Sequence, residues 1–137
     1  MINSLLFNTK ASDPVGATDQ LNWLEDELKN KPGHVILSMH IYPGENYVNK
    51  QESFWHQNYT EWFRILTTVY KEKILIVLGA HTHMPDIRLY SDNVGLFITP
   101  SVSPVFHNNP AFTYFEIDKK EIKNVKFVHF DLNQTTP

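Results

Sequence analysis

The sequence predicts an α/β protein with a mixed sheet and flanking helices. Two apolar segments, Val35–His40 and Lys73–Leu78, have the composition of interior strands that are buried on both faces. Each of them follows a segment in which apolar residues recur at helical spacing. Further strand candidates close the chain. Strands that alternate with helices in this way are typical of α/β proteins.

Length and composition indicate one folded domain. The chain has 137 residues, of which Leu, Ile, Val and Phe together make up 41. That share, about 30%, is well above the roughly 20% below which chains tend to remain disordered. The apolar runs are far shorter than the ~20 residues of a membrane-spanning helix, so we expect no span.

Charge and cysteine content exclude several classes of function. The net charge is −3, with 12 basic and 15 acidic residues, which argues against a basic stripe for nucleic acid or for an anionic membrane surface. The absence of cysteine excludes disulfides, thiolate metal ligands and a cysteine nucleophile. Residues Met1–Lys10 lack the basic and apolar regions of a signal peptide.

The first half of the chain is predicted to alternate short strands with one helix. Leucines at i, i+3 and i+7 define the helix, and Lys31-Pro32-Gly33 ends it. The expected elements are a strand over Leu5–Asn8, a loop over Ala11–Gly16, a helix from Thr18 or Asp19 to Lys29, and the strand Val35–His40.

The second half is predicted to contain a longer aromatic helix and several strands. The expected elements are a turn at Tyr42-Pro43-Gly44, a polar loop over Glu45–Gln57, a helix over Asn58–Glu72, the strand Lys73–Leu78, and strands at Gly95–Thr99, Phe112–Asp118 and Val125–Leu132. The last two strands are joined by Lys119-Lys120-Glu121, as in a hairpin. Residues 133–137 form a tail.

Two histidines directly follow the second interior strand. His81 and His83 are separated by one residue, and in an extended segment such residues point the same way. Their imidazoles could converge on one metal ion or on two neighbouring ions. Ligand sites of open α/β sheets lie at this carboxyl end of the strands. The alternative is a loop that carries two solvated histidines by chance.

His40 ends the first interior strand in the same manner. If the two strands are neighbours, three imidazoles meet at one edge of the sheet. Neutral imidazole suits zinc and similar divalent metals. Alone, His40 would be interpreted as a structural residue at a strand end. The remaining histidines, at positions 34, 56, 107 and 129, are interpreted as structural.

These segments resemble those of a known enzyme family. His40-Ile41-Tyr42-Pro43-Gly44 is similar to the His-x-Pro-Pro-Gly segment of calcineurin-like metallophosphoesterases, and Ala80-His81-Thr82-His83 to their Gly-His-Thr-His. Within that family the chain resembles most the branch of acid sphingomyelinase and sphingomyelinase-like phosphodiesterases. Other segments in the same order are Gln20–Leu24, Trp55–Tyr59, Thr99–Pro104 and Asn109-Pro110.

The resemblance implies a site with two divalent metal ions, expected to be zinc. By position, His40 and His81 would bind the second metal and His83 the first. The ions would activate a water that attacks a phosphodiester, either a small molecule or a lipid head group. Three residues are expected to contact the substrate: Tyr42, Trp55 and Asn109. Asp86 could orient a ligand histidine or could instead cap a helix or turn.

Only part of the family's site is present in the sequence. The resemblance calls for Asp-x-His, Gly-Asp and Asn-His-Glu segments before the His-x-Pro-Pro-Gly segment, and none occurs among the 39 residues that precede His40. Residues 1–132 are therefore expected to form the C-terminal part of a metallophosphoesterase-like domain, the C-terminal half of a layered α/β/β/α fold. Tyr42 replaces a proline of the family pattern, and Ala80 replaces a glycine.

Three functional hypotheses follow from this incomplete site. In the first, the chain is part of a metal-dependent phosphodiesterase, and an upstream segment or a partner chain supplies the missing ligands. In the second, it is an inactive remnant that acts as an interaction or assembly module, with apolar strands that another protein covers. In the third, it is a separate three-histidine zinc protein. Family resemblance implies a secreted or lysosomal location.

Overall fold

The computed structural model describes residues 1–46, 52–91 and 94–133 and has a mixed α/β architecture, which confirms the predicted fold class. Parts of the predicted Glu45–Gln57 loop and of the predicted tail lie outside these residues. In chain order the elements are η1 (Ser4–Phe7), α1 (Pro14–Asn30), β1 (Val35–Ser38), α2 (Gln57–Val69), β2 (Ile74–Gly79), β3 (Asp86–Ser91), β4 (Val94–Ile98), β5 (Ala111–Asp118) and β6 (Glu121–His129).

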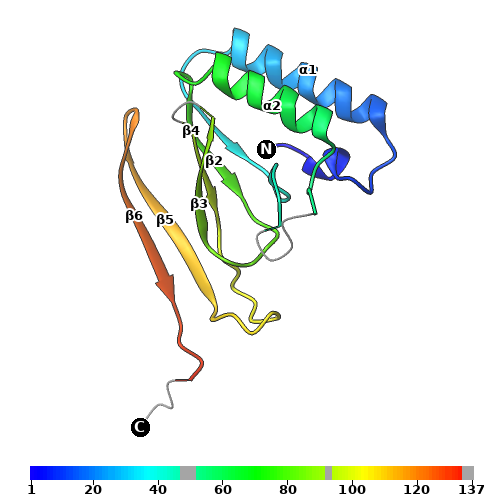
Figure 1. The fold of residues 1–137 in the computed structure, drawn as a ribbon. Helices are drawn as coiled ribbons and strands as arrows, with labels where there is room; N and C mark the ends of the chain where they lie inside the picture. The colour runs from blue at the N-terminus through cyan, green and yellow to red at the C-terminus, as the bar shows by residue number, and fades with distance from the viewer. Residues whose placement is uncertain (47–51, 92–93, 134–137) are drawn as a thin grey trace.

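The central sheet has four strands in the order β1-β2-β4-β3. The first three strands of that order are parallel, and β3 runs antiparallel to β4. Strands β5 and β6 form a separate antiparallel hairpin. Figure 1 shows α1 and α2 side by side over one face of the sheet and the hairpin on its other side. Neither helix, within the described residues, is long and apolar enough to cross a membrane.

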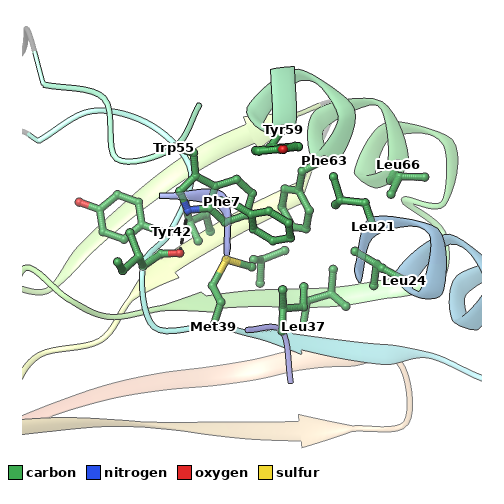
Figure 2. Close-up of a cluster of buried hydrophobic side chains, with 14 of the residues drawn as sticks. Phe7, Leu21, Leu24, Leu37, Met39, Tyr42, Trp55, Tyr59, Phe63 and Leu66 are labelled. Carbon is green, nitrogen blue, oxygen red and sulfur yellow. Dashed lines mark hydrogen bonds between the residues drawn. The ribbon is translucent and has the colours of Figure 1, made fainter. Parts of the chain in front are cut away.

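The core lies between the helices and the sheet and is rich in aromatic side chains. Phe7 and Trp55 are both fully buried, with ring centroids 4.5 Å apart, and Phe63 lies 5.5 Å from Trp55 (Figure 2). The indole nitrogen of Trp55 donates to the Ile41 carbonyl at 3.0 Å, so its polar atom is satisfied. Burial of such large side chains stabilises the fold by about 1.5–3 kcal/mol each.

Helix α1 begins earlier than predicted. Pro14 occupies the first turn, where its missing N–H costs nothing, and the Asp13 side chain accepts a hydrogen bond from the Gly16 N–H at 2.9 Å. The predicted loop Ala11–Gly16 was therefore wrong from residue 14 onward. Asp-Pro was interpreted as a loop signal, although it is also a helix start.

The predicted strand at Leu5–Asn8 is wrong, because these residues lie mostly in the 3-10 helix η1. The helical turn buries Phe7 completely while Leu5 remains 59% exposed, an arrangement set by packing against Trp55. Strand-like pairing occurs just before it instead: Ile2 bridges Met39 in parallel, with its N–H bonded to the Ser38 carbonyl at 2.8 Å.

The two predicted interior strands form β1 and β2, but only one face of β1 is buried. Leu37 faces the core, whereas Ile36 on the opposite face is 47% exposed. The expectation of burial on both faces is therefore wrong for β1. The far face of the sheet is covered only in part, by the hairpin, where Phe97 of β4 meets Phe115 of β5 with ring centroids 5.4 Å apart.

The sequence did not predict strand β3, whereas it did predict the hairpin of β5 and β6. Ile87 and Leu89 alternate with polar residues in β3 but are 68% and 76% exposed, so the strand lies at the sheet edge with little burial. Strand β6 starts earlier and ends earlier than predicted, because Glu121 already pairs with Asp118. Helix α2 and strand β4 form within a few residues of their predicted bounds.

Gly79 ends β2 at a close approach between the sheet and the following loops. A Cβ at this position would lie 2.8 Å from the Tyr42 Cβ, an atom fixed by the backbone. Tyr42 is itself completely buried. The absence of a side chain at Gly79 therefore lets the turn after β1 lie directly against the end of β2.

Replacement of Gly79 by alanine tests this packing. We expect Gly79→Ala to lower the free energy of unfolding by about 1–3 kcal/mol, as overpacking does elsewhere, in urea denaturation. Gly95→Ala is the matched control, because the added Cβ would meet only the ring edge of Phe97, at 3.1 Å. A loss for Gly79→Ala no larger than that of the control would contradict the close approach.

Candidate functional site

The parallel pairing of β1 and β2 places the first two histidines at one edge of the sheet. Ser38 pairs with Leu78, and the ladder continues beyond the strands: the Met39 N–H bonds to the Leu78 carbonyl at 3.0 Å. The Ala80 N–H then bonds to the His40 carbonyl at 2.9 Å. His40 and His81 therefore follow the carboxyl ends of two neighbouring parallel strands and lie side by side. Ligands of open α/β sheets bind at this end of the strands.

The rings of His40 and His81 are in contact. His81 Nδ1 lies 3.3 Å from His40 Nε2, and the ring centroids are 5.2 Å apart at 81°. His40 is exposed, whereas His81 is half-buried. Phe54 packs its edge against His81, with centroids 5.2 Å apart. Two imidazole nitrogens thus face each other on an apolar support.

His81 and His83 do not lie in an extended segment, so that expectation is wrong. Their φ angles are 80° and 62°, in the left-handed region that residues other than glycine seldom adopt. The bends follow directly on β2, and the Thr82 N–H bonds to the Ala80 carbonyl at 3.0 Å. Such backbone strain is found at functional sites, where surrounding packing maintains it.

His83 lies near the other two histidines but has different neighbours. Its ring packs on Phe106 at 4.9 Å between centroids, and its carbonyl accepts from the Ser101 N–H at 3.3 Å. The Nδ1 atom of His83 is buried and lacks a hydrogen-bond partner among the described residues. A buried ring nitrogen without a partner is available to a ligand such as a metal ion.

The environment favours the neutral form of His81. Burial is the main cause that lowers the pKa of His81 below its ordinary value of 6.5, and His40 and His83 lower it further, against a smaller opposing effect of Glu52. Neutral imidazole is the form that binds metal. The lowered pKa of His81 therefore favours the form of this residue that binds metal.

The histidines fit a metal site only in part. Among residues 1–46, 52–91 and 94–133, no group of three or more His, Asp or Glu side chains is arranged to hold a metal ion. The His40–His81 pair and the unpartnered His83 nitrogen fit as imidazole donors. No carboxylate joins them in this part of the chain, so the donor set is incomplete for a two-metal site of the family type.

The other residues expected at the site have structural contacts. Tyr42 and Trp55 are fully buried and support the loops beneath the histidines without reaching an open surface. Asn109 accepts from the Leu132 N–H at 3.1 Å. Asp86 does not cap a helix: it starts β3 and pairs with Arg88 at 2.7 Å. Its second oxygen accepts from the Ile87 N–H, so both contacts link Asp86 to neighbouring residues of β3.

A cavity of about 430 Å³ opens beside His81. Its walls combine apolar and polar side chains, with one basic residue, Lys10, and one acidic residue, Glu52; the lining is Leu5, Asn8, Thr9, Lys10, Ala11, Ile41, Asn46, Glu52, Ser53, Phe54 and His81. Sequence reasoning missed Phe54, whose contact with His81 no motif signalled. It also missed this cavity, because no motif connects the residues around η1 with the histidines.

Comparison with known proteins gives two related phosphodiesterases. The chain is 31% identical over 140 residues to "Sphingomyelinase phosphodiesterase D" of Dictyostelium discoideum, which covers 90% of this chain and 32% of the relative. It is 33% identical over 109 residues to "Sphingomyelin phosphodiesterase 2" of Caenorhabditis elegans, which covers 72% of this chain and 16% of the relative. The chain thus spans a third or less of these relatives. No family model matches it.

The lowered pKa of His81 can be tested by NMR titration. We expect the His81 ring signals to titrate below pH 6.5, and His40→Gln to raise the midpoint by removing the repulsion of a second imidazolium. Because the folded pKa lies below the unfolded one, this group stabilises the fold above about pH 6.5 and the contribution is lost as pH falls below that value.

The control for this titration is His34→Gln, since His34 is exposed and precedes β1 at the opposite end of the strand. That variant should leave the His81 midpoint unchanged. A His81 midpoint at or above 6.5 in the unsubstituted protein would show that burial and the neighbouring rings do not act as described.

Proposed function

Because this chain is a relative of the sphingomyelinase-like phosphodiesterases over 90% of its length, we propose that it forms one half of a metal-dependent phosphodiesterase site. The observation that supports this best is the contact between His40 and His81, 3.3 Å apart, at the carboxyl edge of two parallel strands. The two relatives are named as a sphingomyelinase phosphodiesterase and a sphingomyelin phosphodiesterase. For this chain, hydrolysis of a phosphoric ester is a proposal.

In this proposal, His40 and His81 hold one divalent ion, and His83 holds its neighbour. The ions, expected to be zinc, polarise phosphoryl oxygens and lower the pKa of a water when they are bound. The residues of the chain keep His81 neutral and oriented: burial disfavours its protonated form, and Phe54 contacts its ring. The chain needs no protein nucleophile for this chemistry.

The cavity beside His81 is the proposed place for part of the substrate. Lys10 supplies a positive charge for a phosphodiester, and Glu52 a negative charge for a cationic head group. Phe54 provides an apolar wall of the cavity in contact with His81. This combination suits a phosphodiester small molecule or a lipid head group.

The rest of the site would come from other polypeptide. A two-metal site needs carboxylates to balance the charge of the ions, and the three histidines supply none. The related proteins are about three times as long as the part that this chain matches, or longer. We propose that an upstream segment or a partner chain supplies the carboxylates and an Asn-His pair.

An assembly role without catalysis is the second candidate, and the uncovered face of the sheet favours it. Ile36 of β1 is 47% exposed, and Ile87 and Leu89 of β3 are 68% and 76% exposed. The hairpin adds Phe127, at 48%, which lines a cavity together with Ile87. Apolar area of this extent on one side of a sheet is typical of a surface that binds another protein.

Hydrolysis of a bis-aryl phosphate separates the two candidates. With zinc or manganese, the 137-residue chain alone should give little hydrolysis, because half of the proposed ligand set is absent. A longer polypeptide that adds the remaining part of the relatives should hydrolyse the ester, and His81→Ala should lower its rate by at least about a hundredfold. His34→Ala is the control and should retain activity.

An inactive long form that still binds metal would contradict the catalytic proposal. Light scattering after size-exclusion chromatography then tests assembly: the chain should form a stable complex with a partner or with itself. A well-folded, metal-free monomer would count against both candidates. One equivalent of zinc on the isolated chain, without hydrolysis in the long form, would favour a separate three-histidine zinc protein.

A further inference from the structure

Arg88 links the edge strand β3 to the turn that follows His40. It lies on the edge strand β3, half-buried, with Nε 2.7 Å from the Asp86 carboxylate. Its Nη1 donates to the Glu45 carbonyl at 3.2 Å, and its Nη2 to the Tyr42 hydroxyl at 3.4 Å. One guanidinium thus contacts the segment that follows His40 from a strand that follows His83.

Arg88 also lies over the ring of Tyr42, with Cζ 5.0 Å from the ring centroid. Tyr42 is fully buried and is connected to His81 by aromatic contacts through Phe54. Its ring meets Phe54 at 5.2 Å and 83°, and Phe54 meets His81 at the same centroid distance. The contacts therefore run without a gap from Arg88 to the His40–His81 pair.

The chemistry of this contact favours arginine over any other side chain. The guanidinium is planar and offers several donors in fixed directions, so it can satisfy Asp86 and Glu45 while its face remains on Tyr42. Lysine has a point charge and no planar face. The carboxylate of Asp86 fixes the orientation, and hydrogen bonds to charged groups are the stronger ones.

The turn that Arg88 contacts also packs against the end of β2. Tyr42 presses on Gly79 through carbon atoms, a contact without direction. Beyond it, Gly44 has a φ of 119°, and the Phe54 N–H bonds to the Gly44 carbonyl at 2.9 Å. Arg88 adds directional bonds that connect this turn to β3.

We propose that Arg88 is a positioning residue, which holds the turn after His40 in place so that the imidazoles of His40 and His81 face each other. It does not touch substrate or metal. Its role in ligand geometry rests on the proposed function, whereas its effect on the turn does not. Nothing in the sequence pattern marked it, apart from the Asp-x-Arg spacing that puts both side chains on one face of a strand.

The test compares Arg88→Gln and Arg88→Lys with Arg64→Gln in metal-free protein. Arg64 is the matched control, because it pairs with Glu61 on the exposed side of α2. Two NMR readouts report the turn: the nuclear Overhauser effect between the rings of His40 and His81, and hydrogen exchange of the Trp55 indole N–H, which bonds to Ile41.

In Arg88→Gln we expect the nuclear Overhauser effect between the His40 and His81 rings to weaken. We also expect the Trp55 indole N–H to exchange about tenfold faster, because a charged hydrogen-bond network is lost. Arg88→Lys should restore part of the protection, and Arg64→Gln should match the unsubstituted protein. Unchanged readouts in both Arg88 variants would overturn the proposal. If Arg88→Gln does not fold, the Arg88→Lys readouts decide.

Zinc affinity separates this inference from the proposed function. If the protein binds zinc through the histidines, Arg88→Gln should weaken binding more than Arg64→Gln does. The protein could bind no zinc while the hydrogen exchange of Trp55 and the nuclear Overhauser effect between His40 and His81 change as expected. In that case the metal proposal fails, and Arg88 still positions the turn. If zinc binds and these readouts do not change, the inference alone fails.

Discussion

The structure of the candidate site depends on the parallel pairing of β1 with β2. The hydrogen bonds of this pairing extend past both strands, up to the bond between Ala80 and the His40 carbonyl. His40 and His81 are 41 residues apart in the sequence, and this ladder brings the two residues to the same edge of the sheet. Loss of the pairing would separate the loops and remove the site, whatever the other residues do.

The loops around this ladder are supported mainly by aromatic packing. Trp55 and Tyr42 fill the space beneath the turn after β1, and Phe54 supports His81 from the side. Gly79 leaves room for this arrangement. The packing explains how His81 and His83 can keep left-handed backbone conformations, which cost free energy in isolation. Packing within this chain therefore holds the histidines in place, although they do not make a complete set of metal ligands.

The sequence predicted those features that depend on periodicity. The interior strands, both helices and the hairpin could be predicted, because apolar spacing reports burial directly. Prediction from periodicity failed at η1, because Phe7 is buried by a tertiary contact with Trp55. It also failed at β3, because Ile87 is an apolar residue that remains exposed on an edge strand. Arg88 was missed because its partners lie on segments that are distant in the sequence.

The uncovered sheet face and the partial histidine set are consistent with one another. Relatives that are much longer than the matched region have polypeptide that could contact such a face. At the carboxyl edge of the sheet, that polypeptide would meet the histidines. In this view the chain contributes imidazoles to a site that two parts of a larger assembly complete.

Titration of the chain with Co²⁺, followed by NMR of the imidazole signals, tests the central claim most directly. We predict that the paramagnetic ion shifts or broadens His40, His81 and His83 selectively. The remaining four of the seven histidines, at positions 34, 56, 107 and 129, serve as internal controls and should keep their signals. Equal effects on all the histidines, or effects centred on the controls, would contradict a shared metal site at this edge of the sheet.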